Sequence, residues 1–210
     1  MDAKFVKENF KIQSLEISGK LPDARSNFAY AVSDNGVILH GGHSVVKGKT
    51  KYHNDFLFLD TTTQQWRKVF LLDAPKAREL HALARINNDL YLYGGSTRTG
   101  STVTVFEDFW KFELENVQWH QDPKKKSTDL LGVVAEKITM KTLTPGKRHS
   151  HALISEPAYN MLILFGGFDG VIMSTEPETA SSEIEIPELF DIQLYNATKN
   201  LWIIAEHFGN

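Results

Sequence analysis

Two close pairs of histidines are the residues of this chain whose spacing could support metal chemistry. His40 and His43 are separated by two glycines, and His149 and His151 by one serine. Neutral imidazole is a common ligand of zinc and other transition metals, so a close pair could share one ion. No carboxylate lies close in sequence to His43 or His149 to complete a ligand set. We therefore expect no metal site and no cofactor.

The sequence lacks the common motifs of catalytic nucleophiles and of phosphate binding. A Gly-x-Ser-x-Gly elbow, a phosphate-binding loop, a Gly-x-Gly-x-x-Gly turn and a His-Glu-x-x-His helix are all absent. The chain also has no cysteine, which excludes thiol nucleophiles, disulfide bonds and zinc thiolate sites. We therefore predict a protein that is not an enzyme and has no catalytic residues.

The composition is that of an ordinary globular protein with a weak charge. Hydrophobic residues make up 41% of the 210 residues, and the 23 basic and 26 acidic residues give a net charge of −3. Such a charge provides no positive field for nucleic acid or for an anionic membrane surface. No stretch is apolar over the roughly 18 residues that span a bilayer, and the first residues form no apolar signal. These features predict a cytoplasmic or nuclear protein without membrane insertion.

Three segments of the chain repeat one pattern: an arginine, an apolar stretch that ends in two glycines, and a tryptophan. The arginine precedes the first glycine by 16, 16 and 18 residues, and this glycine precedes the tryptophan by 25, 25 and 36 residues. Matching offsets at several landmarks identify a sequence repeat. The repeated residues, for which we predict structural roles, are Arg25, Arg78, Arg148, Gly41, Gly42, Gly94, Gly95, Gly166, Gly167, Trp66, Trp119 and Trp202.

Repeat position accounts for two of the histidines without any metal. His40 stands just before the paired glycines, where the other two copies have a tyrosine and a phenylalanine. His151 stands three residues after the repeated arginine, where the second copy also has a histidine and the first copy has Phe28.

Each copy is predicted to form four short β-strands, which makes the chain all-β. Turn formers such as Asp34, Asn35 and Gly36 separate the apolar stretches, and no segment shows a sustained 3.6-residue apolar stripe. The paired glycines would provide a turn with positive φ and leave room for a bulky side chain, which we expect to be the tryptophan. The arginine would tie a loop to backbone carbonyls through its five donors.

This pattern resembles the kelch repeat, in which each copy forms one four-stranded blade of a β-propeller. The resemblance covers about residues 21–206 and implies a propeller segment of three antiparallel blades plus an extra N-terminal strand. The expected divisions are a leading strand of a preceding or partner blade at 1–20, blade 1 at 21–72, blade 2 at 73–123, a basic insertion at 124–141, and blade 3 at 142–210 with an acidic loop insertion at 169–188.

The resemblance also implies binding of a protein partner through two sets of loops at the mouth of the propeller. The first set follows the repeated arginine, and the second set follows the paired glycines. Their hydroxyl, imidazole and basic side chains suit a polar peptide with some acidic character. The candidate partner-binding residues are Ser26, Asn27, His43, Ser44, Lys47, Glu79, Ser96, Thr97, Arg98, His149, Ser150, Phe168 and Asp169.

Three blades do not close a ring, since propellers have about four to eight blades. Both outer blades would then have a bare apolar face, which favours association with a partner. The main prediction is a non-enzymatic scaffold or adaptor that binds a partner peptide or protein. The first alternative is an assembly subunit or fragment, in which a homodimer or a larger parent chain completes the propeller. The second alternative is a kelch-fold enzyme that acts on a small sugar or acid.

Overall fold

The computed structural model describes residues 14–71, 73–114, 118–122, 127–139, 144–170 and 189–205, and for residues 70, 118–122 and 127–134 it describes the backbone alone. Within these residues the chain forms β-strands and one short 3-10 helix, η1 (Pro157–Tyr159), so the prediction of an all-β fold is confirmed. The strands are β1 (Ser18–Gly19), β2 (Ala29–Ser33), β3 (Gly36–His40), β4 (His43–Val46), β5 (Lys49–Tyr52), β6 (Phe56–Asp60), β7 (Gln65–Leu71), β8 (Ala82–Ile86), β9 (Asp89–Tyr93), β10 (Ser96–Thr99), β11 (Thr102–Val105), β12 (Phe109–Glu113), β13 (Gln118–Asp122), β14 (Ser127–Lys137), β15 (Ala152–Glu156), β16 (Met161–Phe165), β17 (Ile192–Asn196) and β18 (Leu201–Ile204).

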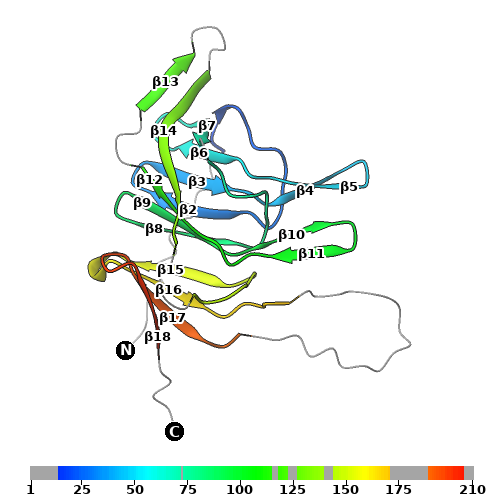
Figure 1. The fold of residues 1–210 in the computed structure, drawn as a ribbon. Coiled ribbons are helices and arrows are strands. Elements are labelled where there is room, and N and C mark those ends of the chain that lie inside the picture. Colours follow the sequence, from blue (N-terminus) through cyan, green and yellow to red (C-terminus); the bar gives the residue numbers. More distant parts are fainter. Residues whose placement is uncertain are drawn as a thin grey trace, which may run out of the picture.

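Three four-stranded antiparallel units follow one another along the chain and pack face to face (Figure 1). The outer strands of the first two units also pair with each other, β14 parallel to β7, so the strands of these two units belong to one ten-stranded sheet. Blade 1 has the strand order β2-β3-β6-β7, blade 2 has β8-β9-β12-β14, and blade 3 has β15-β16-β17-β18. The hairpins β4–β5 and β10–β11 leave blades 1 and 2 between their second and third strands and project to the same side (Figure 1). The predicted propeller segment of three kelch-type blades is therefore confirmed.

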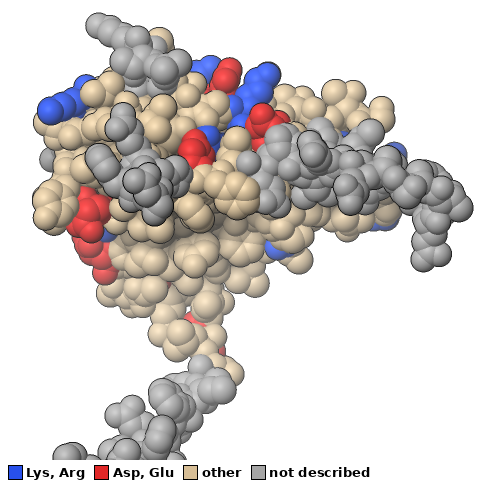
Figure 2. Space-filling model, turned by 90° about the horizontal axis from the view of Figure 1, so that it is seen from below, with Lys and Arg blue, Asp and Glu red and all other residues tan. Residues whose placement is uncertain are grey.

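Blade 2 is apolar on both faces because each face is covered by a neighbouring blade. Along β9, Leu90 and Leu92 belong to the core shared with blade 1, while Tyr91 and Tyr93 belong to the core shared with blade 3. Side chains alternate between the two faces of a strand, so a strand covered on both faces needs a nearly continuous apolar run. The outer face of blade 3 has no covering blade among the described residues. Figure 2 looks from this side and shows a broad area without acidic or basic side chains.

The repeat spacing predicts that the outer strand of blade 2 carries Trp119. In the structure a different strand, β14, lies beside β12. Residues 134–137 of β14 pair with β12, while β13, which contains Trp119, pairs with the other end of β14. Much of the predicted basic insertion is therefore a strand of the sheet. The free edge of β12 needs a partner for its backbone groups, and residues 134–137 of β14 provide it. Residues 123–126, which hold the three successive lysines, lie outside the described residues.

The described part of the N-terminal segment pairs with its own blade. Ser18 and Gly19 of β1 lie parallel to Gln65 and Trp66 of β7 at the outer edge of blade 1. The assignment of a leading strand to a preceding or partner blade remains a prediction for residues 1–13, which lie outside the described residues. Residues 171–188 of the predicted acidic loop also lie outside them.

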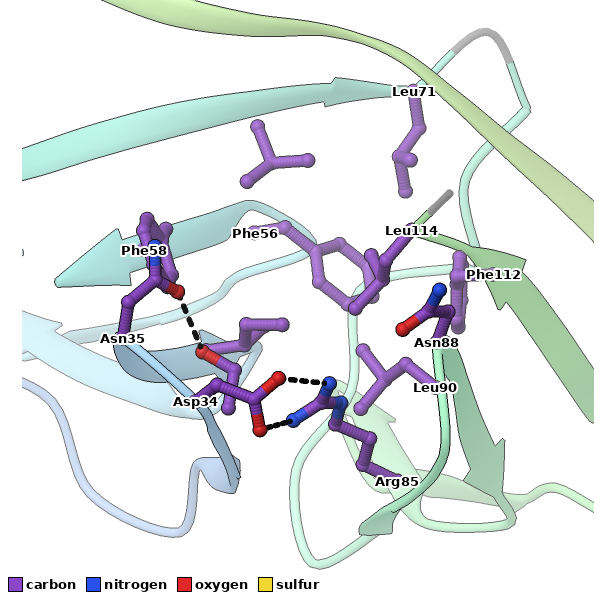
Figure 3. A pocket seen from close by; sticks show the side chains of 13 residues that line it. Asp34, Asn35, Phe56, Phe58, Leu71, Arg85, Asn88, Leu90, Phe112 and Leu114 are labelled. Carbon is purple, nitrogen blue, oxygen red and sulfur yellow. Dashed lines mark hydrogen bonds and ion pairs between the residues drawn. The ribbon is translucent and has the colours of Figure 1, made fainter. Parts of the chain in front are cut away.

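Tryptophan fills the outer part of one blade joint, and the equivalent part of the other joint is hollow. The Trp202 ring packs on Phe109 and Tyr195, with ring centroids 5.4 and 5.2 Å away. Their counterparts Phe56 and Phe112 line a cavity of about 200 Å³ between blades 1 and 2, which the Asp34–Arg85 ion pair flanks (Figure 3). The side chain of Trp119, which has the repeat position of Trp202, lies outside the described ones.

Candidate functional site at the loop end of the blades

The repeated arginine of each blade forms a buried ion pair inside its own blade. In blade 2, Nη1 and Nη2 of Arg78 donate to the two carboxylate oxygens of Asp108 at 2.5 and 2.7 Å, and Nη1 also donates to the Gly94 carbonyl at 2.8 Å. Burial by itself would raise the pKa of the Asp108 carboxyl, but the hydrogen bonds and charge of Arg78 outweigh it and leave this pKa lowered. The same contacts join Arg25 to Asp55 and Gly41, and Arg148 to Asp191 and Gly166.

The paired glycines form the joints between blades. Gly41 and Gly42 both have positive φ, and the Gly42 N–H donates to the carbonyl of Arg78 in the next blade at 2.8 Å. A Cβ on Gly41 would lie 2.7 Å from that carbonyl oxygen and 2.8 Å from the ring of His81. The side chain that approaches the glycine is thus a histidine of the following blade and not the expected tryptophan. Gly94 receives Arg148 and His151 in the same manner.

Three of the histidines are buried parts of these joints. His40 Nδ1 and His81 Nε2 share a hydrogen bond of 2.8 Å, which requires one ring to donate and the other to accept. Burial, followed by neighbouring positive charge, holds the pKa of both rings well below the usual range, and burial with the Arg148 charge lowers the pKa of His151 to about 3. These imidazoles are therefore neutral at physiological pH.

The structure brings the two predicted loop sets together in every blade. Isolated antiparallel bridges pair one residue of the first set with one of the second. The exposed candidates at this end are suited to direct contact with a partner, whereas Ser96 and His149 are buried and contribute to the loop framework. The bridges are Ser26–His43, Glu79–Ser96 and His149–Phe168. The exposed candidates are Ser26, Asn27, Lys47, Arg98, Ser150 and Asp169, and the half-buried ones are His43, Ser44, Glu79, Thr97 and Phe168.

A carboxylate links the loops of blades 1 and 2. One oxygen of Glu79 accepts from Asn27 Nδ2 at 2.7 Å and lies 2.6 Å from His43 Nδ1. Asn27, Leu80 and Ser150 occupy equivalent positions and all have φ of 56°, and the Leu80 N–H donates to the Asn27 carbonyl while the Ser150 N–H donates to the Leu80 carbonyl. The first loop set is therefore a continuous hydrogen-bonded arc across the three blades.

Basic residues lie on the two hairpins that project beside this arc. Lys47 is at the turn of β4–β5, and Arg98 lies on β10 close to the turn of β10–β11; both are exposed. In blade 3 the equivalent segment begins with Phe168 and Asp169, and the Phe168 ring lies 5.9 Å from that of His149. The candidate site thus has a basic side on blades 1 and 2 and an acidic residue on blade 3.

Sequence reasoning missed two side chains that support this site. His53 Nε2 lies 2.9 Å from Ser44 Oγ, and burial followed by the Arg25 charge lowers the pKa of His53. Burial and the Glu79 carboxylate raise the pKa of Tyr52, the last residue of β5. Neither residue is repeated in the other copies, so the repeat pattern offered no signal for them.

The described residues contain no cluster of three or more histidine, aspartate and glutamate side chains that could hold a metal ion. Within the same part of the chain, no helix is long and apolar enough to cross a bilayer.

Three stacked four-stranded units, joined through paired glycines, define a β-propeller segment of the kelch type. A profile of the KLHDC2/KLHL20/DRC7 Kelch-repeats domain matches residues 4–203. The chain belongs to this kelch-repeat family.

Two curated proteins resemble about half of the chain. Adagio-like protein 1 of Oryza sativa subsp. japonica is 29% identical over 116 residues, which are 53% of this chain and 17% of that protein. Putative protein tag-53 of Caenorhabditis elegans is 28% identical over 112 residues, which are 51% of this chain and 8% of that protein. The matched segments span less than a fifth of either relative, so the similarity is that of a repeat segment.

Proposed function

We propose that this chain is a non-enzymatic protein-interaction module of the cytoplasm, which binds a partner peptide through the loops at the mouth of its blades. The observation that carries the proposal is the set of bridges that places the two loop sets side by side in all three blades. Binding residues on loops held by a rigid sheet scaffold are the usual arrangement of recognition sites. Kelch domains in general bind proteins, which agrees with this role.

The charges of the site favour a peptide with acidic character. Arg98 and Lys47 are exposed and project from neighbouring hairpins, and the nearby Glu79 carboxylate is already engaged by Asn27 and His43. A peptide carboxylate that binds Arg98 or Lys47 would therefore not compete with the Glu79 carboxylate for these donors. Bidentate hydrogen bonding makes arginine well suited to a carboxylate.

Fluorescence anisotropy with a labelled hexa-glutamate peptide, against a hexa-lysine peptide, tests this site. Arg98→Ala should weaken the acidic peptide about tenfold, as expected for loss of one charge-assisted hydrogen bond, and leave the melting temperature unchanged. Lys199→Ala is the matched control, because Lys199 is an exposed base on the distant turn between β17 and β18. Equal loss with both variants, or no preference for the acidic peptide, would overturn the proposed site.

A second function, assembly through the outer blade faces, is favoured by side-chain exposure. Leu83 and Leu153 are buried where each faces the preceding blade, but the equivalent Tyr30 of blade 1 is 61% exposed. The face of blade 1 therefore has the composition of a blade joint without a covering blade, and it would bind the face that completes the propeller.

A further inference from the structure

The two outer faces of the three-blade unit are the two halves of one blade joint. Ala31 of blade 1 and Ala84 of blade 2 face the following blade and are 7% and 5% exposed, whereas the equivalent Ile154 of blade 3 is 57% exposed. Tyr30, as described above, is the exposed residue on the opposite face. One outer face thus repeats the forward side of an internal joint, and the other repeats the backward side.

Each internal joint contains the same three backbone hydrogen bonds between neighbouring blades. Between blades 2 and 3, the Gly95 N–H donates to the Arg148 carbonyl, the Arg148 N–H donates to the Phe106 carbonyl, and the Ser150 N–H donates to the Leu80 carbonyl, at 2.8, 3.2 and 2.8 Å. The joint of blades 1 and 2 repeats them, from Gly42 to Arg78, from Arg78 to His53, and from Leu80 to Asn27, at 2.8, 3.1 and 3.0 Å.

The outer faces carry the unused partners of a third such joint. On blade 3, these groups are the Gly167 N–H and the carbonyls of Leu189 and Ser150. On blade 1, they are the N–H and carbonyl of Arg25 and the N–H of Asn27. None of these groups has a hydrogen-bond partner within the described part of the chain. The donors and acceptors of the two faces therefore match one for one.

The glycine pair of blade 3 meets no following blade among the described residues, although Gly166 itself is buried. A Cβ on Gly41 would clash with the following blade, whereas the nearest described atom to a Cβ on Gly166 is the carbonyl oxygen of Leu189 in the same blade, at 3.3 Å. Gly166 and Gly167 nevertheless have the positive φ of the other pairs, 67° and 100°. The backbone is thus already shaped to receive a following blade.

The side chains of the two outer faces differ from those of the internal joints at both of the positions that would meet. In the internal joints, the residue before the paired glycines meets a histidine: His40 bonds His81, and the Tyr93 ring lies 5.7 Å from that of His151. In the outer faces the equivalent residues are Phe165 and Phe28, which are 49% and 41% exposed. Two phenylalanine rings have no polar atoms, so closing this joint would leave no ring nitrogen without a hydrogen-bond partner.

We propose that a second copy of this chain docks on these faces, with blade 1 of each copy against blade 3 of the other. Phe28 of one copy would cover Gly166 and Phe165 of its partner, in the place that His81 and His151 take inside the chain. Two copies hold six described blades, which is within the range in which propellers close. This inference rests on the second proposed function and names the occupant of the faces.

Sedimentation equilibrium of the full chain tests the proposal through its mass. We expect twice the chain mass of 23.8 kDa, with no growth to larger species at higher concentration. Phe165→Glu and Phe28→Glu should each weaken the dimer about tenfold or more, because a charge replaces a buried ring in both joints. Tyr159→Glu is the matched control, since Tyr159 is an exposed aromatic residue on η1 of the same blade. Unaltered circular dichroism would show that the variants fold.

Two single-cysteine chains test the register of the joint, since the natural chain has no cysteine. Asn27→Cys mixed with Ser150→Cys should give a disulfide-linked heterodimer under mild oxidation, because residues joined by a backbone hydrogen bond lie within disulfide reach. Lys199→Cys mixed with Ser150→Cys should not. A dimer that forms without this cross-link and is unaffected by Phe165→Glu would overturn the proposed interface.

Binding of the apolar dye anilinonaphthalene sulfonate separates failure of this inference from failure of the assembly function. If the chain is a monomer that binds the dye, and binds less of it after Phe165→Glu, its apolar faces are free. The proposal of a second copy would then be wrong, while assembly with another protein would stand. A monomer that binds no dye would overturn both.

Discussion

Replacing Asp108 tests whether the ion pair inside each blade holds the loop end together. Arg78 is fully buried, and Asp108→Ala removes two of its hydrogen bonds while the guanidinium stays charged. Breaking a buried pair by removing one partner costs about 3–5 kcal/mol, because an uncompensated charge remains. Two carbonyl acceptors and the Phe106 ring, 4.2 Å from the guanidinium carbon, still contact Arg78. We therefore expect a loss near the lower end, about 3 kcal/mol.

Urea denaturation at one protein concentration measures this loss. Asp34→Ala is the matched control, because Asp34 also forms a bidentate pair with an arginine, Arg85, but its side chain is 90% exposed and solvent screens the pair. The double variant Arg78→Met, Asp108→Leu should recover part of the loss, since no buried charge remains. Equal destabilisation by Asp108→Ala and Asp34→Ala would refute the reasoning.

The pH dependence of stability gives an independent measure of the same pair. The lowered pKa of Asp108 means that its contribution is complete above the usual aspartate pKa of about 3.9 and is lost as the pH falls through the folded-state value. The Asp108→Ala chain should lack this part of the acid loss. A parallel loss in both chains would show that the carboxylate does not stabilise the fold.

Three further changes test the joints and the core by urea denaturation. Trp202→Ala should cost about 3–5 kcal/mol by cavity formation, whereas Tyr159→Ala, at an exposed position, should change stability by less than about 0.5 kcal/mol; similar effects would show that the indole is not core. His151 has a folded pKa of about 3 against about 6.5 when unfolded, so it lowers stability as the pH falls below 6.5, by about 2 kcal/mol at pH 5. His151→Gln should reduce the acid-dependent loss by this amount, while His40 and His81 keep their part of it; an unchanged loss would contradict the burial of His151 as a neutral ring. Gly94→Ala should cost at least about 2 kcal/mol more than Gly48→Ala, because both glycines have positive φ but the described atoms crowd only Gly94; equal costs would show that the joint is loose.

Much of the blade architecture is predictable because its signals are local and occur three times. The apolar stretches, the paired glycines and the turn formers follow one another within each copy, so their spacing indicates the strands and the positive φ directly. The carboxylate partner of the arginine also has a signal in the repeat spacing. Asp55 and Asp108 each follow the repeated arginine by 30 residues.

The candidate site is predictable only in outline. The repeat places two loop sets at one end of the blades, but local spacing does not determine which of their side chains face solvent. Ser96 and His149 are buried because the bridge in each blade draws the second loop set against the first. The Glu79 network depends on two blades standing next to each other, and residues from different copies have no fixed relation in a repeat pattern.

The sequence by itself determined the repeated unit, its all-β character and the positions that link one blade to the next. The tertiary structure decided which strand closes blade 2 and which side chain lies against the glycines. Residues 134–137 take the edge of β12 in competition with the strand at Trp119, and His81 reaches Gly41 from the neighbouring blade. Both outcomes depend on contacts between segments far apart in the chain, because an edge pairs with whichever strand and blade are brought beside it.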